Sequence, residues 1–118
     1  MRRFWGLVLG LGVGMMLFAG CKALPPPTPL DQLNAQQMHG HAVYQAHCAV
    51  CHADRTNDVL HGPALRGIFK QDYLPSGAPA NDDRVMGTIL LGRGMMPALG
   101  RTMDPQERED LMAYLHTL

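Results

Sequence analysis

The stretch Cys48-Ala49-Val50-Cys51-His52 constrains this chain more than any other, because it fits the five-residue pattern C-x-x-C-H. In that pattern each cysteine forms a thioether with a haem vinyl group, and the two-residue spacer brings both sulfurs to one edge of the porphyrin. The following histidine then lies beneath the iron, where a neutral imidazole nitrogen is a good axial ligand. The sequence therefore predicts one covalent haem held by Cys48, Cys51 and His52.

Two other uses of a C-x-x-C pair compete with haem attachment. A dithiol redox site is expected within a βαβ pattern, whereas the flanks of this pair look helical. A structural zinc site needs four ligands, usually from a second pair of cysteines or histidines at similar spacing. The third cysteine of the chain, Cys21, has a different explanation.

The first 20 residues have the layout of a secretory signal. A short basic start, Met1-Arg2-Arg3, is followed by an apolar run over residues 4–18 and by small residues. The run is shorter than the roughly 20 residues that a helix needs to cross a bilayer. We therefore expect residues 1–20 to be a cleaved signal peptide, with an uncleaved N-terminal anchor as the alternative.

The end of this signal, Leu17-Phe18-Ala19-Gly20-Cys21, resembles the lipobox of bacterial lipoproteins, with Phe18 in place of the usual leucine. The resemblance implies that Cys21 becomes an acylated first residue, and several acyl chains give stable anchoring. Lys22 in place of aspartate favours outer-membrane retention on the periplasmic side. The alternative is an ordinary signal with an incidental cysteine.

The remaining chain reads as a tether followed by one domain. Residues 21–33 carry four prolines, which favour extended polyproline geometry, so we expect a semi-rigid spacer of about 3 Å per residue. Residues 34–118 are enough for one domain. Arg2 and Arg3 account for two of ten basic residues, so the mature chain has eight against ten acidic ones. This near-neutral balance indicates neither nucleic acid nor a strongly charged partner.

Three helices are expected in the domain. Asn34 with Gln37 predicts a capped start for a helix to about His47, and Asn81 or Asp82 caps a second helix that ends near Leu91 before Gly92. Asp104, Pro105 and Glu107 predict the start of the last helix. The apolar face of the last helix should cross the face of the first that carries Gly40 and Tyr44. The members of that last face are Leu111, Tyr114, Leu115 and Leu118.

Two further stretches complete the predicted haem site. We expect the Pro63 carbonyl to accept the Nδ1 proton of His52 and Leu65 to pack on the haem, with an ordinary turn as the alternative. Met96 is the predicted sixth ligand, because a thioether is a soft ligand and Pro97 restricts Met96 to extended geometry. Met95, Met103 and His61 are the alternatives.

Together these residues resemble a class I cytochrome c over about residues 34–118. The strongest matches are Cys48-Ala49-Val50-Cys51-His52, Gly62-Pro63-Ala64-Leu65, Met96-Pro97 and Ala113-Tyr114-Leu115. The resemblance implies an all-α fold of three to five helices around one haem c, with the N- and C-terminal helices crossing. It also implies His52 and Met96 as axial ligands. Arg66, Tyr73 and Arg93 are candidates for binding the haem propionates.

The expected function is single-electron transfer in the bacterial cell envelope rather than catalysis. Its partners would be redox proteins such as a dehydrogenase, reductase or oxidase, with the membrane reached through the lipid anchor. A five-coordinate haem that binds small gases or reduces peroxide is the second hypothesis. An exported structural lipoprotein without cofactor is the third.

Overall fold

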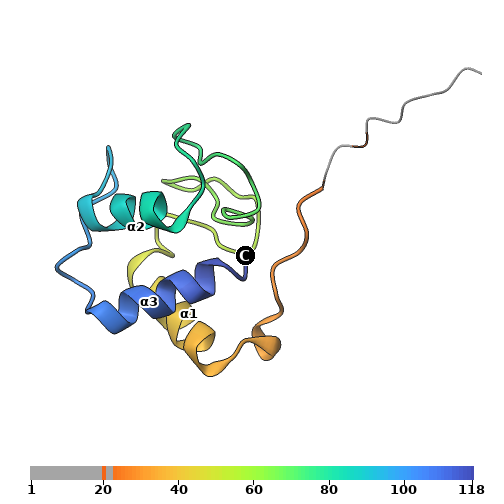
Figure 1. Ribbon diagram of the computed structural model, residues 1–118, viewed down its shortest axis with the longest axis horizontal. Coiled ribbons are helices and arrows are strands. Elements are labelled where there is room, and N and C mark those ends of the chain that lie inside the picture. The colour runs from red at the N-terminus through yellow and green to blue at the C-terminus, as the bar shows by residue number, and fades with distance from the viewer. Residues whose placement is uncertain (1–19, 21–22) are drawn as a thin grey trace, which may run out of the picture.

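The computed structural model describes Gly20 and residues 23–118 (Figure 1). Apart from Gly20, the predicted signal peptide and Cys21 lie outside these residues. The described part holds one 3-10 helix, η1 (Leu30–Gln32), and three α-helices without strands, which confirms the all-α prediction. The α-helices are α1 (Ala35–His47), α2 (Asp82–Leu91) and α3 (Pro105–Leu115). None of the helices within the described residues is both long and apolar enough to cross a membrane.

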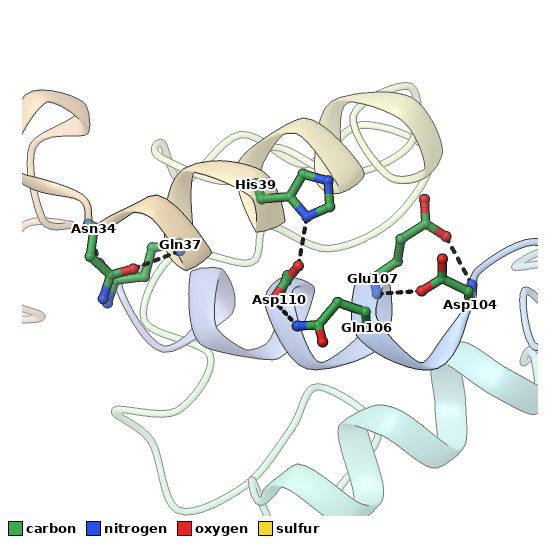
Figure 2. A network of polar contacts seen from close by, with 7 residues as sticks. All are labelled: Asn34, Gln37, His39, Asp104, Gln106, Glu107 and Asp110. Carbon is green, nitrogen blue, oxygen red and sulfur yellow. Dashed lines mark hydrogen bonds and ion pairs between the residues drawn. The ribbon is translucent and has the colours of Figure 1, made fainter.

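The helices begin and end where the sequence places their caps. The Asn34 side-chain oxygen accepts from the backbone N–H of Gln37 at 2.8 Å. The Gln37 side-chain oxygen in turn accepts from the backbone N–H of Asn34 at 3.0 Å. Asp104 and Glu107 form the same reciprocal pair at the start of α3 (Figure 2). Pro105 at the first position of this helix lacks only the N–H group that the helix would leave unpaired. These two capping boxes satisfy backbone donors that the helices leave free.

α1 and α3 cross at Gly40, as predicted. A Cβ atom built on Gly40 would lie 1.9 Å from the Asp110 carbonyl oxygen and 2.8 Å from Cβ of Tyr114. Only a residue without a side chain therefore allows this backbone approach. Tyr44 of α1 and Tyr114 of α3 pack together in the core at this crossing, with ring centroids 5.8 Å apart. The buried members of this core include Val43, Tyr44, Leu111, Tyr114, Leu115 and Leu118.

A polar contact joins the two helices beside this crossing (Figure 2). Nδ1 of His39 lies 2.6 Å from Oδ2 of the buried Asp110, whose other oxygen accepts from Gln106 at 2.8 Å. The hydrogen bond to Asp110 raises the pKa of His39, with smaller contributions from the charges of Glu107 and Asp104. The same bond, with that from Gln106, lowers the pKa of Asp110.

This pair predicts a pH-dependent stability difference between the wild-type protein and His39→Gln. The contribution of His39 is complete below its ordinary pKa of 6.5 and is lost as pH rises through the raised value. The contribution of Asp110 is present above 3.8 and is lost as pH falls through the lowered value. Denaturant unfolding should therefore show the largest difference at about pH 5 and a smaller one at about pH 8.

His41→Gln is the matched control, because the His41 ring lies against Gln45, Tyr44 and Tyr114 rather than against a carboxylate. Its effect on unfolding should change little over the same pH range. A His39→Gln effect of equal size at both pH values would show that the ion pair does not form.

The structure differs from the prediction for the proline-rich segment. Residues 24–28 lie along the domain, and Thr28 donates its amide to the Thr117 carbonyl at 2.8 Å. The expected spacer therefore contacts, at Thr28, the domain that it was expected to hold at a distance. The proline pattern carries no information about whether the backbone meets a surface, and residues 30–32 of the expected spacer form the 3-10 helix η1.

Candidate functional site

The C-x-x-C-H segment forms a tight turn at the C-terminal end of α1. Cys48 ends the helix, and its amide donates to the Tyr44 carbonyl at 2.8 Å. The Cys48 carbonyl then accepts from the amides of Cys51 at 3.0 Å and His52 at 2.9 Å. These bonds fold the two cysteines and the histidine into one compact unit.

Cys48 and Cys51 form no disulfide, and Cys48 is buried whereas Cys51 is half-buried. Burial raises the pKa of the Cys48 thiol to about 11, with a further contribution from Cys51. Dithiol redox sites need the opposite, a thiol whose pKa is lowered by surroundings such as a helix N-terminus. Cys48 lies instead at a helix C-terminus, where the helix dipole is negative. The surroundings of this pair therefore disfavour the dithiol interpretation.

His52 is held by both its ring and its backbone. Nδ1 lies 2.8 Å from the Pro63 carbonyl oxygen, and since a carbonyl only accepts, Nδ1 carries the proton. The lone pair of the neutral ring is then on Nε2, the nitrogen available to a metal. The Tyr44 hydroxyl donates to the His52 carbonyl at 2.5 Å. Burial, together with the charge of Asp54, raises the pKa of Tyr44 to about 12, so this donor keeps its proton.

Gly62 lies against the face of the His52 ring. A Cβ atom at this position would lie 2.4 Å from Cε1 and 2.8 Å from Nδ1 of His52. The Gly62 amide also donates to the Cys51 carbonyl at 2.8 Å, which fixes the loop across the turn. Sequence reasoning gave Gly62 no role of its own, although its position just before Pro63 is a usable signal.

Leu65 follows this loop and faces the interior. Its amide donates to the Ala53 carbonyl at 2.7 Å, and its half-buried side chain packs against the core. Such a position is compatible with packing on a porphyrin. The contact with the haem itself stays a prediction.

The loop after α2 distinguishes the three candidate methionines. Met96 is half-buried and packs against the core, whereas the Met95 side chain is 85% exposed. Met103 is buried in the core itself, where it fills space near the start of α3. Of these two adjacent methionines, Met96 is therefore the one whose side chain reaches the interior. Its ligation of iron stays a prediction.

Gly92 fixes the conformation of this loop. It ends α2 with a φ of 74°, and a Cβ atom there would lie 2.6 Å from the Met96 carbonyl oxygen. Arg93 and Met96 exchange backbone hydrogen bonds of 3.0 and 2.9 Å, and the Leu99 amide donates to Ile89 at 2.9 Å. The methionine is therefore carried by a loop that is bonded back onto its own helix.

The propionate candidates are separated by their exposure. Arg66 is half-buried and donates to the Asn57 side chain at 3.4 Å, whereas Tyr73 and Arg93 are exposed. These three residues stay candidates.

The site fits a covalent haem on its own chemistry. Two cysteines that form no disulfide lie one turn apart, an imidazole presents Nε2, and a glycine leaves room for the ring of that imidazole. Around this site the three helices form a c-type haem domain.

The chain belongs to the cytochrome c family. The family model described as "Cytochrome C oxidase, cbb3-type, subunit III" matches residues 35–115. Cytochrome c6 of Tetradesmus obliquus is 31% identical over 77 residues, which cover 65% of this chain and 84% of that protein. Cytochrome c6 of Nostoc is 29% identical over 115 residues, with 98% and 92% covered.

A solved structure shows the same fold. Cytochrome c6 from the diatom Phaeodactylum tricornutum superposes with a TM-score of 0.53 at 23% identity, covering 67% of this chain and 88% of that one. The predicted cytochrome c fold, the family resemblance and haem c as the cofactor are thereby confirmed. The protein is therefore a cytochrome c6-like electron carrier.

Proposed function

We propose that this protein carries single electrons in the bacterial cell envelope, with His52 and Met96 as the axial ligands of its haem. The observation that carries the proposal is the contrast between two adjacent methionines. Met96 packs against the core on a loop bonded to α2, whereas Met95 is exposed. A methionine held in this way can fill the second axial position, which separates an electron carrier from a haem that binds substrate.

Hydrogen bonds to backbone groups fix the positions of both proposed ligands. The Pro63 carbonyl fixes the tautomer and orientation of His52, and the paired backbone bonds of Arg93 and Met96 fix the opposite loop. The bound haem supplies a one-electron iron couple, whose potential rises with methionine opposite histidine. Ligands held by the fold change position little between the two oxidation states, which favours fast transfer.

Apolar side chains beside the attachment turn supply a docking rim for redox partners. Val50 within the turn is 74% exposed and Val59 in the neighbouring loop is 76% exposed. His61, two residues beyond Val59, lies 3.3 Å from the Val50 carbonyl through Nδ1, so the loop and the turn are adjacent. A small apolar rim suits the weak, short-lived contacts of electron transfer.

The proposed attachment to the membrane is based on the sequence alone. Cys21 is the proposed acylated residue, on the periplasmic side of the outer membrane, with an uncleaved N-terminal helix as the alternative. The family description names an oxidase subunit, so a terminal oxidase belongs among the proposed partners with dehydrogenases and reductases.

Carbon monoxide tests this function against a five-coordinate haem. If Met96 occupies the sixth position, adding carbon monoxide to the ferrous protein near neutral pH should leave its absorption spectrum unchanged, because no position on iron is open. A five-coordinate haem would bind the gas and shift its main absorption band. Such a shift in the wild-type protein would favour gas binding or peroxide reduction over electron transfer.

A further inference from the structure

The proline-rich segment is bound to the domain at its downstream end. The Thr28 amide donates to the Thr117 carbonyl at 2.8 Å, and Nη2 of Arg55 donates to the Thr28 carbonyl at 2.6 Å. Both backbone groups of one residue are therefore satisfied by the domain. Arg55 follows Asp54, whose carboxylate accepts from the buried Tyr114 hydroxyl, so this contact lies on the core rather than on a mobile loop.

The upstream end of the segment contacts the domain at a second place. Leu24 is half-buried, and its Cδ1 atom would lie 2.9 Å from a Cβ atom built on Gly67. Gly67 itself has a φ of 68°, a backbone conformation that favours glycine. Nη2 of Arg66 lies 3.5 Å from the Leu24 carbonyl. We call residues 24–28 the strap, because both of its ends contact the domain.

Few residues separate the strap from Cys21. Only Lys22 and Ala23 separate Cys21 from Leu24, and three Cα steps span at most about 11 Å. A domain of the size of residues 34–118 has a radius of gyration of about 12 Å. A linker shorter than the radius of the domain does not allow it to turn freely above a membrane.

We propose that the strap holds the side of the domain around Arg66 and Gly67 against phospholipid headgroups and leaves the loop that carries Met96 facing away. This inference rests on the proposed acylation of Cys21. Figure 1 shows the strap at one side of the domain and the connection between α2 and α3 at the other. Arg66 and the exposed Lys70 supply positive charge near the strap, which suits anionic headgroups.

The first test addresses the strap without the membrane. In the ferrous holoprotein the Thr28 amide should exchange with solvent at least about tenfold more slowly than in an unfolded peptide. Thr28→Ala keeps this amide and should keep its protection. An unprotected amide in both proteins would show that the segment is free and would overturn the proposal.

The second test measures orientation on vesicles of phosphatidylethanolamine and phosphatidylglycerol that carry a nitroxide on their headgroups. In the acylated ferrous protein, the nitroxide should reduce the backbone amide NMR signals of residues 66–70 the most and those of residues 92–100 the least. Thr28→Pro removes the donor to Thr117 and should reduce this difference, whereas Thr28→Ala should retain it. A Gly-Ser insertion between Ala23 and Leu24 should abolish it.

The possible failures are distinguishable. Equal loss of intensity in both regions of an acylated protein would overturn the orientation and leave the electron carrier intact. An intact mass without acyl chains on Cys21 would overturn both the orientation and the proposed anchor. Protection of Thr28 would then still show the strap.

Discussion

Replacing Met96 with alanine should convert the ferric protein from a low-spin to a high-spin spectrum and remove the weak far-red band of methionine ligation. Its reduction potential should fall by on the order of 100 mV, within the roughly 0.8 V over which axial ligands set haem potentials. The reason is the loss of a thioether that favours the ferrous state. Absorption spectroscopy and a redox titration measure both effects.

Met95→Ala is the matched control, because its side chain is 85% exposed and adjacent in sequence. Its spectrum and potential should match those of the wild-type protein. If Met96→Ala kept the low-spin spectrum, another residue such as His61 would be the sixth ligand. If Met95→Ala alone lost that spectrum, the assignment of the two methionines would be reversed.

Gly40→Ala should destabilise the holoprotein by about 2–3 kcal/mol, although alanine is the better helix former. The added Cβ atom would lie 1.9 Å from the Asp110 carbonyl oxygen, and that oxygen belongs to the backbone of α3. The helices must separate to accept it, which loosens the core around Tyr44 and Tyr114. Guanidinium unfolding followed by helical circular dichroism measures the loss.

Gly87→Ala, also at a glycine within a helix, should have the opposite effect on stability. A Cβ atom at Gly87 in α2 would meet nothing within 4 Å, so alanine should stabilise by about 0.5–1 kcal/mol. Two substitutions of the same kind should therefore change stability in opposite directions. A stabilising Gly40→Ala would contradict the close crossing of α1 and α3.

The helices and their crossing could be predicted from the sequence because they depend on local signals. Asn34 with Gln37 and Asp104 with Glu107 lie three residues apart, so the cap and its partner are visible together. Gly40 stands on an apolar face whose period matches a helix, and a glycine there indicates close approach. The C-x-x-C-H segment is likewise contiguous, which is why the attachment site needs no tertiary information.

The remaining features depend on contacts between residues far apart in the chain. Thr28 meets Thr117, and Leu24 meets Gly67, through partners that no local pattern links. His39 and His116 are exposed, yet they pair with Asp110 at 2.6 Å and with Asp82 at 2.8 Å, partners that lie 71 and 34 residues away in the chain. The short helix η1 has no apolar face to reveal it, since none of its residues is buried.

The most direct test of the central claim is the intact mass of protein made in cells competent for cytochrome maturation, combined with thiol alkylation. We predict a mass increased by one haem that survives acid and organic extraction, with Cys48 and Cys51 both resistant to alkylation after denaturation. A colourless protein of unmodified mass at these positions, in which both thiols react, would contradict the claim.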